Sequence, residues 1–258
     1  MLATATGTTN GIATRVLGEG LPVTVFAHGL GGSTAECRPL AARVGGTRVL
    51  MDFRGHGDSD PLVDGWDYDL LAGDLLAVAD ATGATQAVGL SLGAGALMRL
   101  LSRDPERFDR LAFVMPAAID STRRDGATVR LERLGDAIRR GDAQAAADCL
   151  LEELPHGVRD RRGVSALVLR RAQQLVVRPA PQPRSDDRPV SDRAQLAQVA
   201  APALVVGQAD DPLHPMAIAR ELTLALPNAT LRTFGEGGVF WTEAEAAQTA
   251  LALHLGAA

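Results

Sequence analysis

The 258-residue chain contains no lysine, so all 26 of its basic residues are arginine. The absence of lysine excludes chemistry that proceeds through a lysine Schiff base. Aromatic residues are scarce, at 3%, and the net charge is −5. Nucleic-acid binding depends on clustered positive charge, so we expect no nucleic-acid partner.

Only two cysteines occur, Cys37 and Cys149, and their wide separation does not resemble a metal-binding motif. Two reduced structural thiols in a cytoplasmic protein are the simpler interpretation. The N-terminal segment lacks the basic and apolar stretches of a secretion signal. Uncharged apolar runs of membrane-spanning length are also missing. We therefore expect a cytoplasmic protein that has no membrane partner.

The residues that are present describe an ordinary globular chain, with 46% hydrophobic and 22% charged residues. Short apolar runs alternate with amphipathic stretches, which predicts an α/β fold whose mostly parallel central sheet carries helices on both faces. We expect strands at residues 22–27, 47–52, 85–90, 111–115, 203–207 and 230–234, and helices at 34–44, 68–81, 92–102, 216–226 and 242–255. The run at 12–17 fits one arm of an antiparallel hairpin at the sheet edge.

The alternation stops between residues 117 and 191, where helical spacing is followed by a proline-rich segment. This pattern favours a helical cap inserted into one domain over an independent second domain. The predicted core therefore comprises residues 1–116 and 192–258, and the predicted cap comprises residues 117–191.

The segment Gly89-Leu90-Ser91-Leu92-Gly93 places a hydroxyl between two glycines, directly after an apolar run and before a helical pattern. A serine at such a strand-to-helix turn has a strained backbone and an exposed oxygen. The small residues two positions before and after it prevent clashes between neighbouring segments. The alternative is an ordinary glycine-rich turn that contains a serine by chance.

Three further polar segments follow predicted strands. They are His28-Gly29-Leu30-Gly31-Gly32-Ser33, Phe53-Arg54-Gly55-His56-Gly57-Asp58-Ser59, and Gln208-Ala209-Asp210-Asp211-Pro212-Leu213-His214-Pro215. Ligands of parallel sheets bind outside the carboxyl ends of the strands. All of these segments are therefore expected to converge with Ser91 on one crevice.

Together these segments resemble the α/β-hydrolase superfamily, and in particular its esterase- and lactonase-like members. The resemblance implies the α/β-hydrolase fold, with Ser91 as nucleophile and the backbone N–H groups of Leu30 and Leu92 as an oxyanion hole. It also implies that Asp211 is the acid of the site, with Asp210 as its competitor. His28 and His56 are expected to shape the loops.

One position departs from this family's pattern. The general base of the family is a histidine in the loop after the last strand, and here Val239 occupies its place. Valine cannot accept the serine proton, and a serine hydroxyl is a poor nucleophile at neutral pH without a base. His214 is the best substitute because it lies three residues beyond Asp211 and would share a helix face with it. The simpler interpretation of His214 is an exposed histidine at a helix entrance, and neither His156 nor His254 lies in a motif.

The working hypothesis is an enzyme that is weakly hydrolytic or non-hydrolytic and catalyses an elimination, cyclisation or rearrangement. Its substrate would be a small, largely apolar carbonyl or ester compound. The substrate pocket would be lined by His28, Gly29, Val239, Phe240 and Trp241. Alternatives are an inactive ligand-binding pseudo-hydrolase, a conventional serine esterase with His214 as base, and an engineered variant without a base. We expect no cofactor and no metal, and the oligomeric state stays open.

Overall fold

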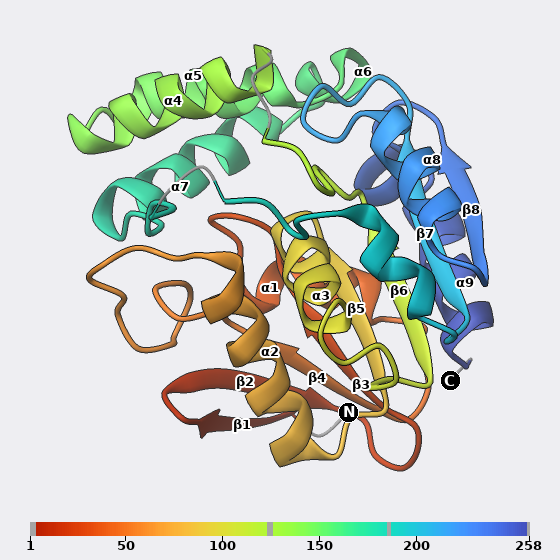
Figure 1. Cartoon of the computed structure of the whole chain (residues 1–258). Coiled ribbons are helices and arrows are strands. Elements are labelled where there is room, and N and C mark those ends of the chain that lie inside the picture. The colour runs from red at the N-terminus through yellow and green to blue at the C-terminus, as the bar shows by residue number, and fades with distance from the viewer. Residues whose placement is uncertain (1–3, 123–125, 185–186, 257–258) are drawn as a thin grey trace.

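A computed structural model describes residues 4–122, 126–184 and 187–256, and its central element is an eight-stranded sheet (Figure 1). The strand order is β1-β2-β4-β3-β5-β6-β7-β8, with β2 antiparallel to β1 and β4 and all other pairs parallel. The strands are β1 (Thr4–Thr9), β2 (Ile12–Leu17), β3 (Val23–Ala27), β4 (Thr47–Met51), β5 (Gln86–Leu90), β6 (Arg110–Val114), β7 (Ala203–Gln208) and β8 (Ala229–Phe234). This arrangement confirms the predicted fold class and the hairpin at the sheet edge.

Helices cover both faces of the sheet. Helices α2 (Tyr68–Thr82), α3 (Leu92–Leu101) and α8 (Met216–Ala225) pack on one face, and α1 (Thr34–Leu40) and α9 (Ala244–Leu255) pack on the other. Alternate residues of β3 divide between the two cores, with Val25 facing α2 and α3 and Phe26 facing α1 and α9. Because both faces are covered there, the inner parallel strands β3, β5 and β7 are buried along their whole length, whereas the edge strand β8 is half exposed.

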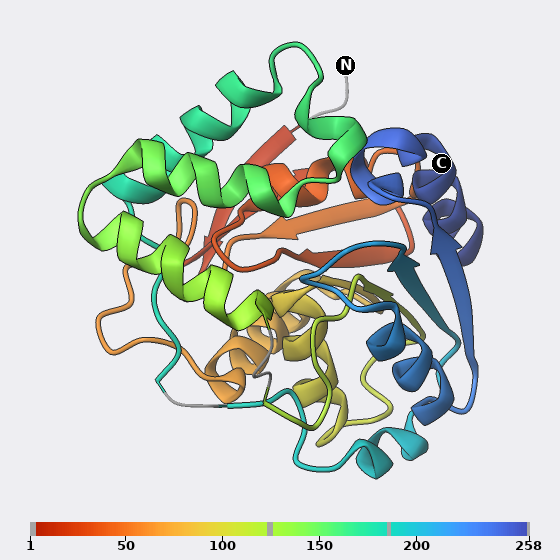
Figure 2. The ribbon, with the colours of Figure 1, turned by 90° about the horizontal axis from the view of Figure 1, so that it is seen from above.

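The inserted stretch between β6 and β7 carries α4 (Gly126–Arg139), α5 (Ala143–Glu153), α6 (His156–Arg159) and α7 (Val164–Val177). These helices gather at one end of the molecule (Figures 1 and 2) and enclose a small apolar core of their own. Arg171 of α7 donates to the carbonyl oxygen of Gly31, and the N–H of His156 donates to Glu236. Because Gly31 follows β3 and Glu236 follows β8, the helices lie over the carboxyl ends of the strands. The exact limits of the cap stay a prediction.

Short helical turns complete the chain. They are a 3₁₀ turn at Arg193–Gln198 and a π-helical turn at Gly238–Thr242. None of the helices among the described residues is both long enough and apolar enough to span a bilayer.

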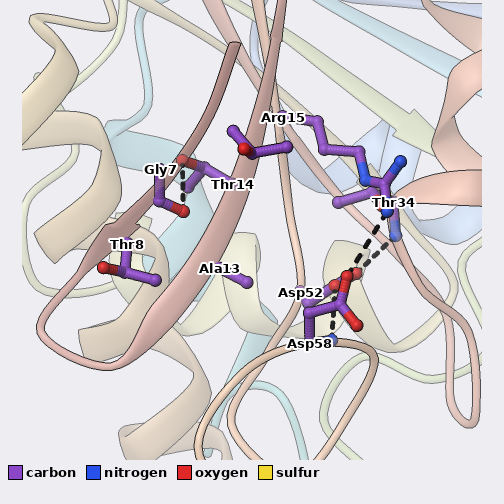
Figure 3. A pocket seen from close by; sticks show the side chains of 9 residues that line it. Gly7, Thr8, Ala13, Thr14, Arg15, Thr34, Asp52 and Asp58 are labelled. Atoms are coloured by element: carbon purple, nitrogen blue, oxygen red, sulfur yellow. Dashed lines mark hydrogen bonds and ion pairs between the residues drawn. The ribbon is translucent and has the colours of Figure 1, made fainter. Parts of the chain in front are cut away.

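A buried carboxylate organises the loop after β4. Asp52 accepts the backbone N–H of Thr34 at 2.5 Å and that of Asp58 at 2.9 Å, so its charge is satisfied by two different loops. Figure 3 shows these bonds in a shallow pocket of about 310 Å³ beside β2, which Arg15 and Asp58 also line. This pocket shares no lining residue with the serine turn, and its buried carboxylate already has donors.

Two buried histidines lie beside this carboxylate, with the rings of His28 and His56 centred 5.0 Å apart. Nε2 of His28 accepts the N–H of Phe53, which requires that nitrogen to be unprotonated. Burial lowers the pKa of each histidine to about 4. Both imidazoles are therefore neutral near pH 7, and each hydrogen-bonds to a carbonyl oxygen of its own loop.

The free energy of unfolding is expected to fall as the pH drops below about 6.5. The unfolded chain protonates His56 near pH 6.5, whereas the folded protein does so only near pH 4, so the unfolded state binds more protons between these values. Between pH 7.5 and pH 5, His56 alone should lower the free energy of unfolding by about 2 kcal/mol. Denaturant titrations of the wild type and His56→Gln at both pH values measure this difference. The exposed His156→Gln is the control, and an identical pH dependence in His56→Gln and the wild type would contradict the prediction.

Candidate active site

Ser91 occupies the turn between β5 and α3 in a strained conformation, with φ 50° and ψ −105°. A non-glycine residue at positive φ is uncommon and requires support from its surroundings. That support is close packing: a Cβ on Gly89 would overlap the backbone of Gly93, and a Cβ on Gly93 would overlap the carbonyl oxygen of Ala27. The two glycines therefore let α3 begin directly against β3 and β5, which presents Ser91 above the sheet.

An imidazole lies beside this serine. Nε2 of His214 is 2.9 Å from Oγ of Ser91, and Nδ1 of His214 is 2.9 Å from Oδ2 of Asp211. The side chain of His214 is 12% exposed. The expectation of an exposed histidine at a helix entrance is therefore wrong, as is the expectation that the serine has no base within reach. Asp211, rather than the exposed Asp210, is the member of the acidic pair that contacts the ring.

A turn, and not a helix, brings Asp211 and His214 together. Helix α8 begins only at Met216, so the two residues do not share a helix face as the sequence analysis supposed. Instead, Oδ1 of Asp211 accepts the backbone N–H groups of Leu213 at 2.9 Å and His214 at 3.0 Å. Such local side-chain-to-backbone bonds are typical of aspartate in turns. The acid and the imidazole thus come from one short loop after β7.

The carboxylate of Asp211 is held in its ionised form. Burial alone would raise its pKa, but the hydrogen bonds from His214 and Leu213 and the charge of a protonated His214 outweigh burial. The net result is a pKa below the ordinary aspartate value. An ionised Asp211 requires a proton on Nδ1 of His214, which leaves Nε2 free to accept the hydroxyl proton of Ser91.

The loop after β8 does not supply the base. Val239 is 2% exposed and packs with Phe240 in the core between the sheet and α9, whereas Trp241 packs against the apolar core of the inserted helices. The predicted role of these three residues in a substrate pocket stays a prediction. The backbone N–H of Val239 donates to Oε1 of Gln208 at 3.0 Å.

Gly29 lies directly against the serine, since a Cβ placed on it would be 3.5 Å from Cβ of Ser91. Its N–H donates to Oε2 of Glu36 at 2.9 Å. Arg171 of α7 donates to the carbonyl oxygen of Gly31 and lies 3.8 Å from the other oxygen of Glu36. The loop that carries Leu30 is therefore held by hydrogen bonds to two side chains, Glu36 of α1 and Arg171 of α7. The predicted roles of Leu30 and Leu92 stay predictions.

A cavity of about 570 Å³ adjoins Asp211 beneath the inserted helices. Five of its eleven lining residues are acidic, and the residues are Glu152, Glu153, Leu154, Pro155, His156, Arg159, Asp210, Asp211, Pro212, Met216 and Glu236. Burial raises the pKa of Glu153 to about 7, and its Oε1 is buried without a hydrogen-bond partner among the described residues.

Three polar residues of this region received no specific role from the sequence: Gln208, Glu36 and Arg171. Gln208 had a detectable signal, because it is polar and directly follows an apolar strand that leads to the acidic pair. The signals of the other two were indistinct, because a glutamate in an amphipathic helix and an arginine in an arginine-rich insertion are both typical of solvated surfaces.

Comparisons with known proteins identify the family and the fold. The sequence pattern of the family described as alpha/beta hydrolase fold matches residues 22–240. AB hydrolase superfamily protein YisY of Bacillus subtilis is 27% identical over 244 residues, which cover 89% of each chain. Two solved structures share the fold: the enol-lactonase from Burkholderia xenovorans LB400 (TM-score 0.74, 22% identity, 97% and 99% coverage) and naproxen esterase from Bacillus subtilis (TM-score 0.76, 18% identity, 98% and 91% coverage).

The close packing of the serine turn predicts opposite effects for two glycine-to-alanine substitutions. Gly93→Ala should destabilise the protein by roughly 1–3 kcal/mol, because the new methyl group overlaps the backbone of β3. Gly73→Ala, in the middle of α2 with open space around its Cα, should stabilise it by about 0.5–1 kcal/mol. Thermal and denaturant unfolding measure both effects. Equal stability of the two variants would show that α3 does not approach β3 this closely.

Proposed function

Because the chain belongs to the alpha/beta hydrolase family, we propose that it is a serine esterase that cleaves small carboxylic esters or lactones. The observation that carries this proposal is the imidazole of His214, which lies within hydrogen-bonding distance of both Ser91 and Asp211. This proposal replaces the hypothesis of a weakly hydrolytic enzyme, which depended on the absence of a base.

In the first step, Oγ of Ser91 attacks the ester carbonyl carbon while Nε2 of His214 takes the hydroxyl proton. The imidazolium that forms is stabilised by the carboxylate of Asp211. The tetrahedral intermediate then expels the alkoxide, which receives the proton from His214, and an acyl group remains on Ser91. A water molecule, deprotonated by His214, hydrolyses this acyl enzyme and regenerates the serine.

The negative oxygen of the intermediate is stabilised by the backbone N–H groups of Leu30 and Leu92. Leu92 is the first residue of α3, so its N–H has no partner within the helix and lies at the positive end of the helix dipole. The N–H groups of Gly29 and Gly93 on either side are already engaged, with Glu36 and with the carbonyl oxygen of His28. These bonds support a loop conformation in which the two leucine N–H groups donate to the negative oxygen of the substrate.

The acidic lining of the 570 Å³ cavity supports a preference for uncharged substrates. Its carboxylates outnumber its basic side chains, and Arg159 is directed to the carbonyl oxygens of Leu154 and Glu152. A substrate that brings a carboxylate into this cavity would meet repulsion at short range. The proposed substrate is therefore a neutral ester.

Substitution of the base should abolish hydrolysis. We expect His214→Ala to lower kcat for p-nitrophenyl butyrate by roughly 10⁴–10⁶-fold and to slow the labelling of Ser91 by a fluorophosphonate, because the hydroxyl then keeps its proton. Ester turnover and mass spectrometry of the labelled peptide are the measurements. His254→Gln, in α9, is the control and should retain full activity, because a glutamine amide can still donate to the carbonyl oxygen of Leu111.

Turnover by His214→Ala at the wild-type rate would remove His214 from the mechanism. A wild-type protein that neither hydrolyses esters nor reacts with the fluorophosphonate would contradict the proposed function as a whole.

The cavity predicts discrimination by substrate charge. At pH 8.5, kcat/KM for p-nitrophenyl pentanoate should exceed that for mono-p-nitrophenyl succinate, an anion of similar length, by about three- to tenfold. The ratio should fall at pH 6, because Glu153 is ionised above its raised pKa of about 7 and neutral below it. Glu153→Gln should remove much of this pH dependence. Faster turnover of the succinate ester would show that nearby arginines, and not the carboxylates, dominate the electrostatic potential in the cavity.

A further inference from the structure

Gln208 lies at the junction of the acid and the loop after β8. It is the last residue of β7, is 7% exposed, and its side-chain amide makes two hydrogen bonds. Nε2 donates to Oδ2 of Asp211 at 3.3 Å, and Oε1 accepts the backbone N–H of Val239 at 3.0 Å. The amide therefore bridges the carboxylate to the backbone of a different loop.

The orientation of this amide is determined by its two partners. A backbone N–H only donates, and an ionised carboxylate only accepts, so the oxygen must face Val239 and the nitrogen must face Asp211. A side chain at position 208 can make both bonds only if it presents an acceptor on one side and a donor on the other. Glutamine meets this requirement, as does a protonated glutamate, whereas an ionised glutamate or a methionine does not.

The contacts of Asp211 explain why such a bridge matters. Its oxygens receive the N–H groups of Leu213 and His214 and the Nδ1 proton of His214, all from the turn that Asp211 itself begins. These bonds define the turn internally but do not tie it to the sheet. The bond from Gln208 comes from β7 and is connected through Val239 to the loop after β8, so it ties the carboxylate to the sheet that also carries Ser91.

We propose that Gln208 is a positioning residue of the esterase site, which holds the carboxylate of Asp211 in line with the His214 ring by bridging it to the backbone of Val239. This inference rests on the proposed function, since it assigns a role in the same site. It also gives the loop after β8 a role that does not require a histidine. The backbone N–H of Val239 in this loop holds the side chain of Gln208, and Gln208 in turn donates to Asp211.

The inference is tested with Gln208→Met and Gln208→Glu. We expect Gln208→Met to lower kcat about tenfold at every pH, with KM nearly unchanged, because a bond to a charged group is lost. The Gln208→Glu variant should be active only while the introduced carboxyl group is protonated, since the neutral acid can replace both bonds and the ionised acid repels Asp211. In the wild type, kcat/KM should rise with pH to a plateau. In Gln208→Glu, kcat/KM should rise and then fall again, which gives a bell-shaped profile.

Gln86 provides the matched control, because it is a buried glutamine of β5 whose Oε1 accepts a hydrogen bond from Thr24 at 2.9 Å. Gln86→Met and Gln86→Glu should change stability without introducing an alkaline limb in the pH profile. The positioning role would be overturned if both Gln208 variants lost kcat equally and independently of pH, and by the same factor as the Gln86 variants. Gln208 would then contribute only packing. Wild-type kcat in folded Gln208→Met would overturn it as well.

A measurement without turnover separates this inference from the proposed function. The Nδ1 proton of His214, hydrogen-bonded to Asp211, should give a downfield proton resonance in NMR spectra that is lost in His214→Ala. We expect this resonance to shift in both Gln208 variants and to stay unchanged in both Gln86 variants. An unshifted resonance in the Gln208 variants contradicts the inference, whether or not the protein hydrolyses esters. Absence of ester turnover in the wild type, with the resonance shifting as expected, contradicts only the proposed function.

Discussion

The hydrogen bond between Nε2 of His214 and Oγ of Ser91 joins residues 123 positions apart, and the proposed chemistry of the site depends on it. Each partner reaches this bond through local constraints. Ser91 is held by a strained turn that two glycines make possible, and His214 is held by a turn around the carboxylate of Asp211. The sheet brings the two turns together, because β5 and β7 are parallel and separated only by β6. The proposed esterase activity depends on this alignment.

The histidines of the chain illustrate how surroundings assign different roles to one side-chain type. His28 and His56 are buried beside Asp52 and have lowered pKa values, which suits them to neutral structural hydrogen bonds. His214 is partly accessible and bonded to an ionised carboxylate, an arrangement that suits the proposed role as general base. The difference arises from burial and from the partner, because the imidazole is the same in all three.

The inserted helices also hold the loops around the site and line the cavity beside it. Arg171 bonds the loop after β3, and the segment around His156 bonds the loop after β8, so the insertion contacts two of the loops that surround the site. Its acidic residues also line the cavity beside Asp211. The insertion thus contributes two of the five carboxylates around this cavity, Glu152 and Glu153, whereas the other three and the proposed reacting groups belong to loops of the sheet.

The sequence by itself determined the fold class, the strand-to-helix turn at Ser91 and the acidic pair after β7, because periodicity and glycine placement are local properties of the chain. It did not determine which histidine serves the site. The sequence analysis considered the spacing of Asp211 and His214 on a helix, and in the structure this spacing lies in a turn whose hydrogen bonds rotate the imidazole inward. Only the tertiary structure decided that this ring meets Ser91, because the meeting depends on strand order and on the direction in which a loop side chain leaves the backbone. The same reasoning applies to Gln208, whose two partners belong to separate loops that only the folded sheet places side by side.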